Sequence, residues 1–297
     1  MTELPEPRQF EQTACAASVR QRVLVNGVES APISPFDRGL HFGDGLFETI
    51  ACHAGRPRFL SLHLDRLMHG CARLRIPFQD LAAVRAEIES LAAESERSII
   101  KLLITRGEAA GRGYAIEGLD KAMRITIRYA WPHEPPAPGQ DGVKARTLAM
   151  RLGENPLLAG LKHCNRLEQV LGRAELARTD AAEGILFSSS GRLVSGTMTN
   201  IFIVRSSSLQ TPVMDRCGVA GVMRRVILRE AARSGIPTQE QVLRAEDLHA
   251  ADEIFLSNAR VGIWPVCAVD ERALAAGPLT RRLQELMRPL LEEPRDA

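Results

Sequence analysis

A proline-rich break is the feature that most constrains how this chain folds. Residues 131–142 read WPHEPPAPGQDG, and their four prolines favour an extended, semi-stiff connector over a packed helix or strand. The whole chain has 297 residues, which is more than one small domain needs and suits two. We therefore predict a loose N-terminal extension over residues 1–20, a first domain over 21–131, a linker over 132–142 and a second domain over 143–297.

Hydrophobic periodicity predicts helices and strands on both sides of this break. In the first part, a strand from Arg22 meets an Asn26-Gly27 turn, which is a strong hairpin signal. Further predicted strands there cover 46–53, 98–105 and 122–129, and predicted helices cover 60–74 and 80–93. The second part has predicted strands over 143–150, 184–187, 193–194, 200–204, 254–256 and 263–269, and predicted helices over 165–179, 221–234 and 278–291. The expected fold class is therefore α+β, with an N-terminal α/β domain and a strand-rich C-terminal domain.

Bulk composition argues against several classes of function. The net charge is +2, so bulk electrostatics favour neither nucleic acid nor a membrane surface as a partner. The six cysteines are scattered without a CxxC pair, and His63 and His163 have no ligand companion at helical spacing, so we expect no metal site and no disulfide framework. No apolar run approaches membrane-spanning length, and residues 1–20 lack a signal-peptide apolar region. These features predict a cytoplasmic protein that acts on a small molecule.

Lys162 is the strongest candidate for a catalytic side chain. The chain has 38 basic residues, and only four of them are lysines, at positions 101, 121, 144 and 162. Arginine replaces lysine in most surface roles, but its guanidinium stays protonated and cannot form a Schiff base. Rarity alone does not choose among the four. Lys162 follows a Gly-Leu step and precedes a predicted helix, which suggests a corner facing a pocket, whereas a solvated surface role suits the other three better.

Three other segments could bind ligands, and each also has an ordinary structural explanation. Gly221-Val222-Met223 begins a predicted helix, where free N–H groups favour an anion such as phosphate, although many helices begin after glycine. Arg112 and Tyr114 lie on a Gly-rich loop, which either grips a carboxylate or forms a solvent-facing turn. Residues 37–45 lack the spacing of a nucleotide-binding loop and indicate a shaped turn with a buried Asp–Arg pair.

Several longer motifs together resemble a known family. They are DRGLHFGDGLFE (37–48), HLDRL (63–67), TRGEAAGRGY (105–114), RLGENPLLAGLKHCNRLEQVL (151–171), SGTMTNIF (195–202), GVAGVMR (218–224) and SNARVGIWPV (257–266). From about residue 23 to residue 269 the chain resembles the fold-type IV pyridoxal-phosphate enzymes, the group of branched-chain and D-amino acid aminotransferases and aminodeoxychorismate lyase. The GRGY loop and the long lysine segment are the most specific to the lyase branch. The resemblance implies a barrel-like C-terminal domain, a homodimer, and pyridoxal 5′-phosphate as cofactor.

The resemblance also implies roles for individual residues. Lys162 corresponds to the lysine that carries the cofactor as a Schiff base and then acts as general base. Arg66 corresponds to the arginine that binds the cofactor phosphate. The other implied assignments are Val222, Met223, Asn258 and Ala259 on the phosphate side, and Arg112, Tyr114 and Phe47 at the substrate. In the implied homodimer, the loop near Arg112 would complete the partner's site.

Ser195 departs from the family pattern. The family usually has a Glu five residues before the Asn of this motif, paired to the pyridine nitrogen, and counting back from Asn200 gives Ser195. A carboxylate there keeps the nitrogen protonated and the ring a strong electron sink, which a serine hydroxyl does to a lesser degree. Our hypothesis is that this change favours elimination, as in the conversion of 4-amino-4-deoxychorismate to 4-aminobenzoate and pyruvate. The alternatives are a D-amino acid or branched-chain aminotransferase, and a non-catalytic binding protein of the same fold.

Overall fold

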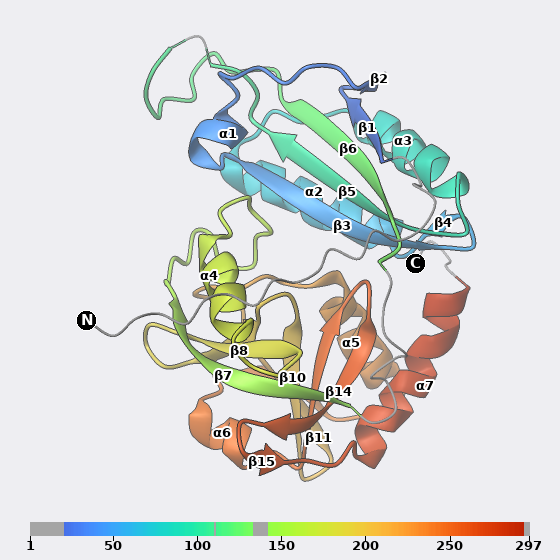
Figure 1. The fold of residues 1–297 in the computed structure, drawn as a ribbon, viewed down its shortest axis with the longest axis vertical. Helices are drawn as coiled ribbons and strands as arrows, with labels where there is room; N and C mark the ends of the chain where they lie inside the picture. Colours follow the sequence, from blue (N-terminus) through green and yellow to red (C-terminus); the bar gives the residue numbers. More distant parts are fainter. Residues whose placement is uncertain (1–20, 110, 133–141, 294–297) are drawn as a thin grey trace.

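The structure, a computed structural model, describes residues 21–109, 111–132 and 142–293. Its two lobes lie one above the other in Figure 1, each built on one sheet. Residues 21–132 form the N-terminal lobe with a six-stranded sheet, and residues 142–293 form the C-terminal lobe with a nine-stranded sheet. The predicted extension over 1–20 and most of the predicted linker fall outside the described residues.

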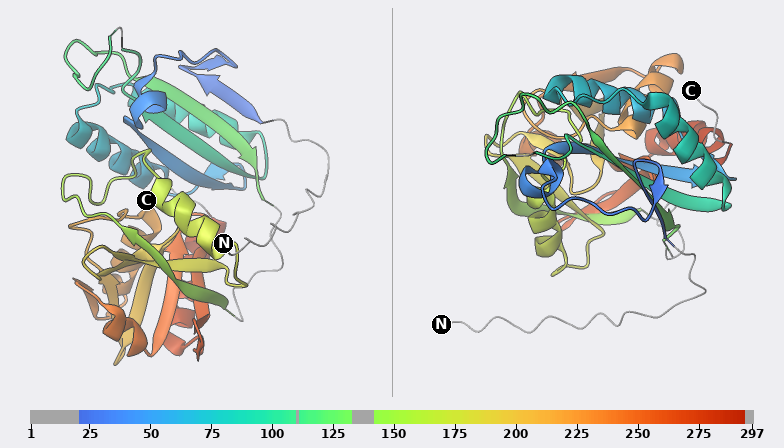
Figure 2. Two further views of the ribbon diagram at one scale, coloured as in Figure 1. Left: turned by 60° about the vertical axis from the view of Figure 1, so that its left-hand side comes forward. Right: turned by 90° about the horizontal axis from the view of Figure 1, so that it is seen from above.

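In the N-terminal lobe, two helices cover one face of the sheet (Figures 1 and 2). The strands are β1 (Arg22–Val25), β2 (Val28–Glu29), β3 (Gly45–His53), β4 (Arg56–Pro57), β5 (Arg97–Thr105) and β6 (Met123–Ala130), in the order β2-β1-β6-β5-β3-β4. The helices are α1 (Arg38–Phe42), α2 (Leu60–Leu74) and α3 (Leu81–Ala93). Alternate residues of β5, Ile100, Leu102 and Ile104, are fully buried against α2 and α3, as the period of a strand requires. The predicted hairpin is confirmed by the pairing of Val25 with Val28.

The C-terminal lobe closes into a barrel. Its strands are β7 (Val143–Leu152), β8 (Glu183–Ser188), β9 (Leu193–Gly196), β10 (Asn200–Arg205), β11 (Ser208–Pro212), β12 (Thr238–Gln241), β13 (Glu253–Asn258), β14 (Gly262–Val269) and β15 (Arg272–Ala273). Neighbouring strands follow the ring β10-β13-β14-β7-β8-β9, and β9 pairs back with β10 through Ser195 and Asn200. The expected barrel-like domain is therefore confirmed, and its closing pair lies at the position where the sequence departs from the family pattern.

Helices seal the outside of the barrel. They are α4 (Leu167–Leu176), α5 (Val222–Arg233), α6 (Ala245–His249) and α7 (Pro278–Glu292). On the α5 and α7 side, Phe202 and Phe255 stack with ring centroids 4.8 Å apart beneath Met223 and Met287. Within the described residues, no helix is long and apolar enough to cross a bilayer.

Some local expectations need correction. The predicted helix over 165–179 is shorter, because residues up to 166 stay irregular and α4 begins at Leu167. Lys162 precedes this helix, as predicted, by five residues, and its neighbour His163 makes an isolated antiparallel bridge with Leu46 of β3. The predicted buried Asp–Arg pair in residues 37–45 is present, with Arg38 Nε donating to Asp44 at 2.9 Å.

Candidate active site

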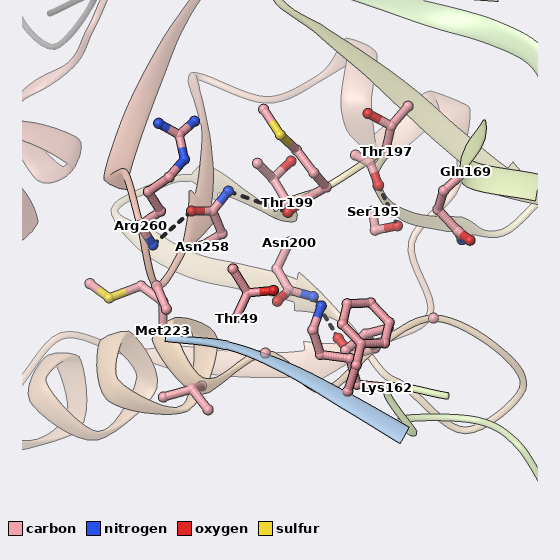
Figure 3. A pocket seen from close by; sticks show the side chains of 18 of the residues that line it. Thr49, Lys162, Gln169, Ser195, Thr197, Thr199, Asn200, Met223, Asn258 and Arg260 are labelled. Carbon is pink, nitrogen blue, oxygen red and sulfur yellow. Dashed lines mark hydrogen bonds between the residues drawn. The ribbon is translucent and has the colours of Figure 1, made fainter. Parts of the chain in front are cut away.

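A cavity of about 350 Å³ lies where the two lobes meet. The N-terminal lobe contributes Phe47, Thr49, His63 and Arg66, and the segment that follows β7 contributes Lys162, Arg166 and Gln169. The barrel contributes Ser195, Gly196, Thr197, Met198, Thr199, Asn200, Gly218, Val219, Gly221, Val222, Met223, Asn258, Ala259 and Arg260. Figure 3 shows Gln169 and Ser195 on one side of this cavity and Met223 on the other. The cavity is large enough for a small-molecule ligand.

Lys162 is held in the cavity wall by backbone pairing with β3. Its carbonyl accepts from Phe47 N at 3.0 Å, and Cys164 N donates to Gly45 O at 2.9 Å. The ammonium nitrogen lies 4.2 Å from the centre of the Phe47 ring. Burial, and then the charge of Arg66, lower the pKa of Lys162 to about 7. At neutral pH about half of these amines are therefore uncharged and able to act as nucleophile or base.

The other lysines have the surroundings of ordinary side chains. Lys144 is exposed and donates to Asp180 at 2.6 Å, which raises its pKa. Lys121 is exposed, and Lys101 projects from β5 with its nitrogen 5.6 Å from the Phe47 ring. Of the four lysines, Lys162 alone both lines the cavity and has a strongly lowered pKa.

One end of the cavity has the geometry of an anion site. The helix α5 begins there, and the amides of Val222 and Met223 belong to its first turn, where no earlier carbonyl of the helix can accept from them. Gly221 precedes them, and a Cβ at this position would lie 2.0 Å from Asn200 Oδ1. Asn200 in turn donates to Val219 O at 2.9 Å and fixes the approach to the helix. A phosphate group fits this cradle, since the backbone can approach it closely and the helix dipole favours negative charge.

Arg66 reaches the same end from α2, in a buried group of three side chains. Its Nε and Nη2 donate to the two oxygens of Glu48 at 2.8 and 2.5 Å, and Nη1 donates to Ala220 O at 3.1 Å. His63 Nδ1 donates to the same Glu48 carboxylate at 2.6 Å. Burial alone would raise the pKa of Glu48, but the charge of Arg66 and the hydrogen bonds from Arg66 and His63 outweigh it and hold the pKa at about 2. We call Glu48, His63 and Arg66 the buried triad.

The opposite side of the cavity carries Ser195. Its hydroxyl donates to Gly196 O at 2.9 Å, and the side chain brings no charge. The acid nearby in sequence, Glu183 of β8, is fully buried and accepts from Thr197 N at 3.0 Å and from the hydroxyls of Thr197 and Thr199. Glu183 holds the turn between β9 and β10 and does not line the cavity.

Among the polar side chains that line the cavity, the sequence-based assignments did not include His63, Arg166 and Gln169. Arg166 Nε donates to His163 O at 2.8 Å, while its Nη2 is buried without a partner among the described residues, as is Gln169 Oε1. Arg166 and Gln169 lie four and seven residues after Lys162, but the segment up to residue 166 is irregular, so no helical spacing relates them to Lys162.

Two predicted substrate residues are not in this cavity. Arg112 and Tyr114 are both exposed, and Tyr114 is 82% accessible. Arg38 holds their loop by donating to the carbonyls of Gly113 at 3.0 Å and Tyr114 at 3.3 Å, and the Tyr114 ring lies 5.2 Å from that of Phe42. By contrast, Lys162, Arg66, Ser195, Val222, Met223, Asn258, Ala259 and Phe47 all line the described cavity.

The barrel, the cavity between the lobes and the family match define a pyridoxal 5′-phosphate-dependent enzyme. The chain belongs to the class IV amino-transferase family, whose model matches residues 45–269. Its fold is the fold-type IV aminotransferase fold, as the resemblance in sequence implies.

Individual relatives include both lyases and aminotransferases. An aminodeoxychorismate lyase from Vibrio harveyi is 34% identical over 88% of this chain and 97% of its own length. The crystal structure of 4-amino-4-deoxychorismate lyase from Pseudomonas aeruginosa has a TM-score of 0.87 and 45% identity, covering 91% of this chain and 99% of that one. A putative branched-chain-amino-acid aminotransferase from Methanocaldococcus jannaschii is 32% identical over 89% of this chain and 94% of its own length.

Proposed function

We propose that this protein is a carbon–oxygen lyase that converts 4-amino-4-deoxychorismate to 4-aminobenzoate and pyruvate, a step of folate biosynthesis. The observation that carries the proposal is the pairing of Lys162, whose pKa is about 7, with a cavity that has Ser195 at its barrel-closing pair. The similarity to lyases from Vibrio harveyi and Pseudomonas aeruginosa supports it.

Lys162 is the base of the proposed reaction. Pyridoxal 5′-phosphate, when bound, supplies a conjugated ring that takes up electrons released at the substrate carbon bearing the amine. Lys162 Nζ accepts the proton from that carbon, C4. The bond between the neighbouring ring carbon and the enolpyruvyl oxygen breaks, and the departing enolate takes up a proton to become pyruvate. The carbocycle is left aromatic, which supplies much of the driving force.

Ser195 favours this outcome over amino-group transfer. A hydroxyl holds less negative charge at the pyridine nitrogen than a carboxylate does, so it supports a long-lived carbanion equivalent less well. Transamination needs such a species to persist until it is reprotonated at the cofactor, whereas elimination ends when the leaving group departs. The uncharged side chain at position 195 therefore suits a substrate with a good leaving group.

Arg166 and Gln169 are placed to meet the substrate on the side away from the phosphate cradle. A buried guanidinium Nη2 without a partner is a costly group, and a carboxylate from the ligand would satisfy it. The substrate carries two carboxylates, and this part of the cavity offers one of them a charged donor. We assign Arg166 as its anchor and Gln169 as a neighbouring polar contact.

The test compares two reactions of the cofactor-loaded enzyme. Formation of pyruvate and 4-aminobenzoate from 4-amino-4-deoxychorismate is measured beside amino-group transfer from D-alanine or L-leucine to a keto acid. We expect elimination to dominate in the native enzyme and Ser195→Glu to raise the transfer rate relative to elimination. Transfer that equals or exceeds elimination in the native enzyme would identify an aminotransferase, and absence of both reactions would identify a binding protein.

We further propose a cytoplasmic homodimer in which the loop of Arg112 and Tyr114 faces the partner's cavity. The support is a set of exposed apolar side chains on α1, on α4 and on nearby loops, at Phe36, Leu40, Tyr114, Leu157, Leu167, Val170 and Leu171. The helices α1 and α4 lie close together, since Asn165 Nδ2, just before α4, donates to Gly43 O, just after α1, at 3.3 Å.

Sedimentation of the native protein tests this assembly. Leu167→Glu should convert a dimer to monomers, while Val242→Glu, at an exposed apolar residue outside these segments, should not. A native protein that sediments as a monomer at micromolar concentration contradicts the homodimer.

A further inference from the structure

His63 in the buried triad has one ring nitrogen that no protein group satisfies. The side chain is fully buried and lines the cavity. Its Nδ1 lies 2.6 Å from Glu48 Oε2, and because Glu48 is ionised, Nδ1 carries the proton of this hydrogen bond. In the neutral ring, Nε2 is then a bare acceptor. Among the described residues Nε2 has no partner, although it is buried.

A buried polar atom without a partner destabilises the fold unless a ligand satisfies it. His63 and Arg66 are three residues apart on α2, so their side chains lie on one face of the helix. Both contact Glu48, and Arg66 also reaches Ala220, just before α5. The bare nitrogen therefore belongs to the end of the cavity that has the anion cradle.

The charges at this end do not suffice for a phosphate dianion. Arg66 donates two hydrogen bonds to the Glu48 carboxylate, so its positive charge is already compensated by the negative charge of Glu48. Around His63 the charged and titratable groups are Glu48 from β3, Arg66 from its own helix and Lys162 from the segment after β7. The first turn of α5 adds a dipole but no full charge. One further positive charge would balance the cradle.

We propose that His63 supplies this charge: it takes up a proton at Nε2 when the cofactor phosphate enters and donates it to a phosphate oxygen. The imidazolium then bridges the Glu48 carboxylate and the phosphate. The proton comes from solvent, and no covalent bond changes. The inference rests on pyridoxal 5′-phosphate as the cofactor, and makes His63 a positioning residue for it.

This arrangement links cofactor affinity to pH. In the empty protein, burial lowers the pKa of His63 below its usual 6.5, despite the opposing effect of Glu48. A bound dianion raises that pKa. Between the two values His63 contributes close to one proton to binding, so this histidine alone should make the dissociation constant rise about tenfold for each pH unit of increase.

Calorimetry with pyridoxamine 5′-phosphate measures this proton directly. This probe carries the phosphate and the ring but no aldehyde, so it does not bond to Lys162. Titrations between pH 7 and 8.5, in buffers that differ in ionisation enthalpy, give the number of protons taken up. Four proteins are compared: the native chain, His63→Asn, His63→Gln, and His69→Gln, in which an exposed histidine of the same helix is changed.

The two variants at position 63 separate proton uptake from hydrogen bonding. Asn keeps a donor near Glu48 and removes the far nitrogen, whereas Gln can place a neutral donor where Nε2 was. We expect both to take up about one proton fewer than the native chain and His69→Gln. We also expect His63→Asn to bind at least tenfold more weakly at pH 7, with His63→Gln weakened less. Pyridoxamine without phosphate should bind equally to all four proteins, which also reports that the variants are folded.

The proposal is overturned if either variant at position 63 takes up as many protons as the native chain. It is also overturned if these variants lose as much affinity for pyridoxamine as for pyridoxamine 5′-phosphate, since His63 would then contact the ring. Failure of the native chain to bind pyridoxamine 5′-phosphate would instead refute the use of this cofactor.

Discussion

Glu48→Gln tests whether the buried triad holds the N-terminal lobe together as well as the cavity. The substitution preserves size and one acceptor oxygen but removes the negative charge. Arg66 then keeps a positive charge with no compensating carboxylate, 2.5–2.8 Å from an amide that cannot accept two strong hydrogen bonds. Breaking a buried pair by removing one partner is strongly destabilising for this reason.

The magnitude follows from the pKa of Glu48. The usual pKa is 4.5 and the folded pKa is about 2. Since one pKa unit corresponds to about 1.36 kcal/mol, the ionised carboxylate contributes about 3 kcal/mol to the free energy of unfolding. Because the folded pKa is depressed, this stability is present above pH 4.5 and is lost as the pH falls towards 2. From pH 5 to pH 3 the free energy of unfolding of the native protein should therefore fall by about 2 kcal/mol more than that of Glu48→Gln. Loss of stability between pH 6.5 and 5 belongs instead to His63 and His163, whose pKa values are both lowered in the folded state.

Urea unfolding of the cofactor-free protein measures these differences. The control is Glu89→Gln, because Glu89 is half-exposed in α3 and its pair with Arg85, at 3.5 Å, should be worth at most about 1 kcal/mol. At pH 7 we expect Glu48→Gln to lower the free energy of unfolding by about 3 kcal/mol. The reasoning is refuted if the two variants differ by less than 1 kcal/mol at pH 7, or if the native protein and Glu48→Gln lose equal stability between pH 5 and pH 3.

Further predictions concern the cofactor. Lys162→Ala should abolish the visible absorbance of the covalently held cofactor and the elimination activity, while Lys144→Ala at an exposed ion pair should keep both. Because the base must be uncharged and the pKa of Lys162 is about 7, the elimination rate should fall about tenfold per pH unit below pH 7, and a rate that is flat down to pH 5 would contradict this. Gly221→Ala should weaken cofactor binding at least tenfold, because the added Cβ would lie 2.0 Å from Asn200. At Gly111 an added Cβ meets nothing within 4 Å, so the Gly111→Ala protein should bind the cofactor as tightly as the native protein. Fluorescence titration measures both affinities.

Elements with a strong period were predictable from the sequence. The helix over 60–74 matches α2 at both ends, because its apolar residues recur at helical spacing and face the sheet. β12 was missed, since Thr238–Gln241 reads TQEQ with no apolar residue. It becomes a strand only because β11 pairs with it in parallel, through Leu209 and Thr238. Such pairing is non-local, and a sequence window does not contain it.

Residues that line the cavity were predictable from the sequence where a motif places a single residue type. Lys162 and Arg66 belong to this group, since an amine and a cation on known motifs suffice to mark them. His63 was considered only as a metal ligand and set aside for want of a companion at i+4. Its partner is Glu48, fifteen residues earlier and on a strand, so folding brings together two groups that no helical spacing relates.

The turn beside the barrel-closing pair does not depend on the side chain at position 195. The turn from β9 to β10 is held by the Glu183 carboxylate, which accepts from Thr197 and Thr199, and the Ser195 hydroxyl reaches only the neighbouring carbonyl of Gly196. The acid that builds the turn and the side chain that faces the cavity are thus separate residues. A carboxylate at position 195 adds charge beside the cavity and removes only that one local hydrogen bond. Under the proposed function, the same scaffold carries a strong or a weak electron sink according to the side chain at position 195, which the comparison of native enzyme and Ser195→Glu tests.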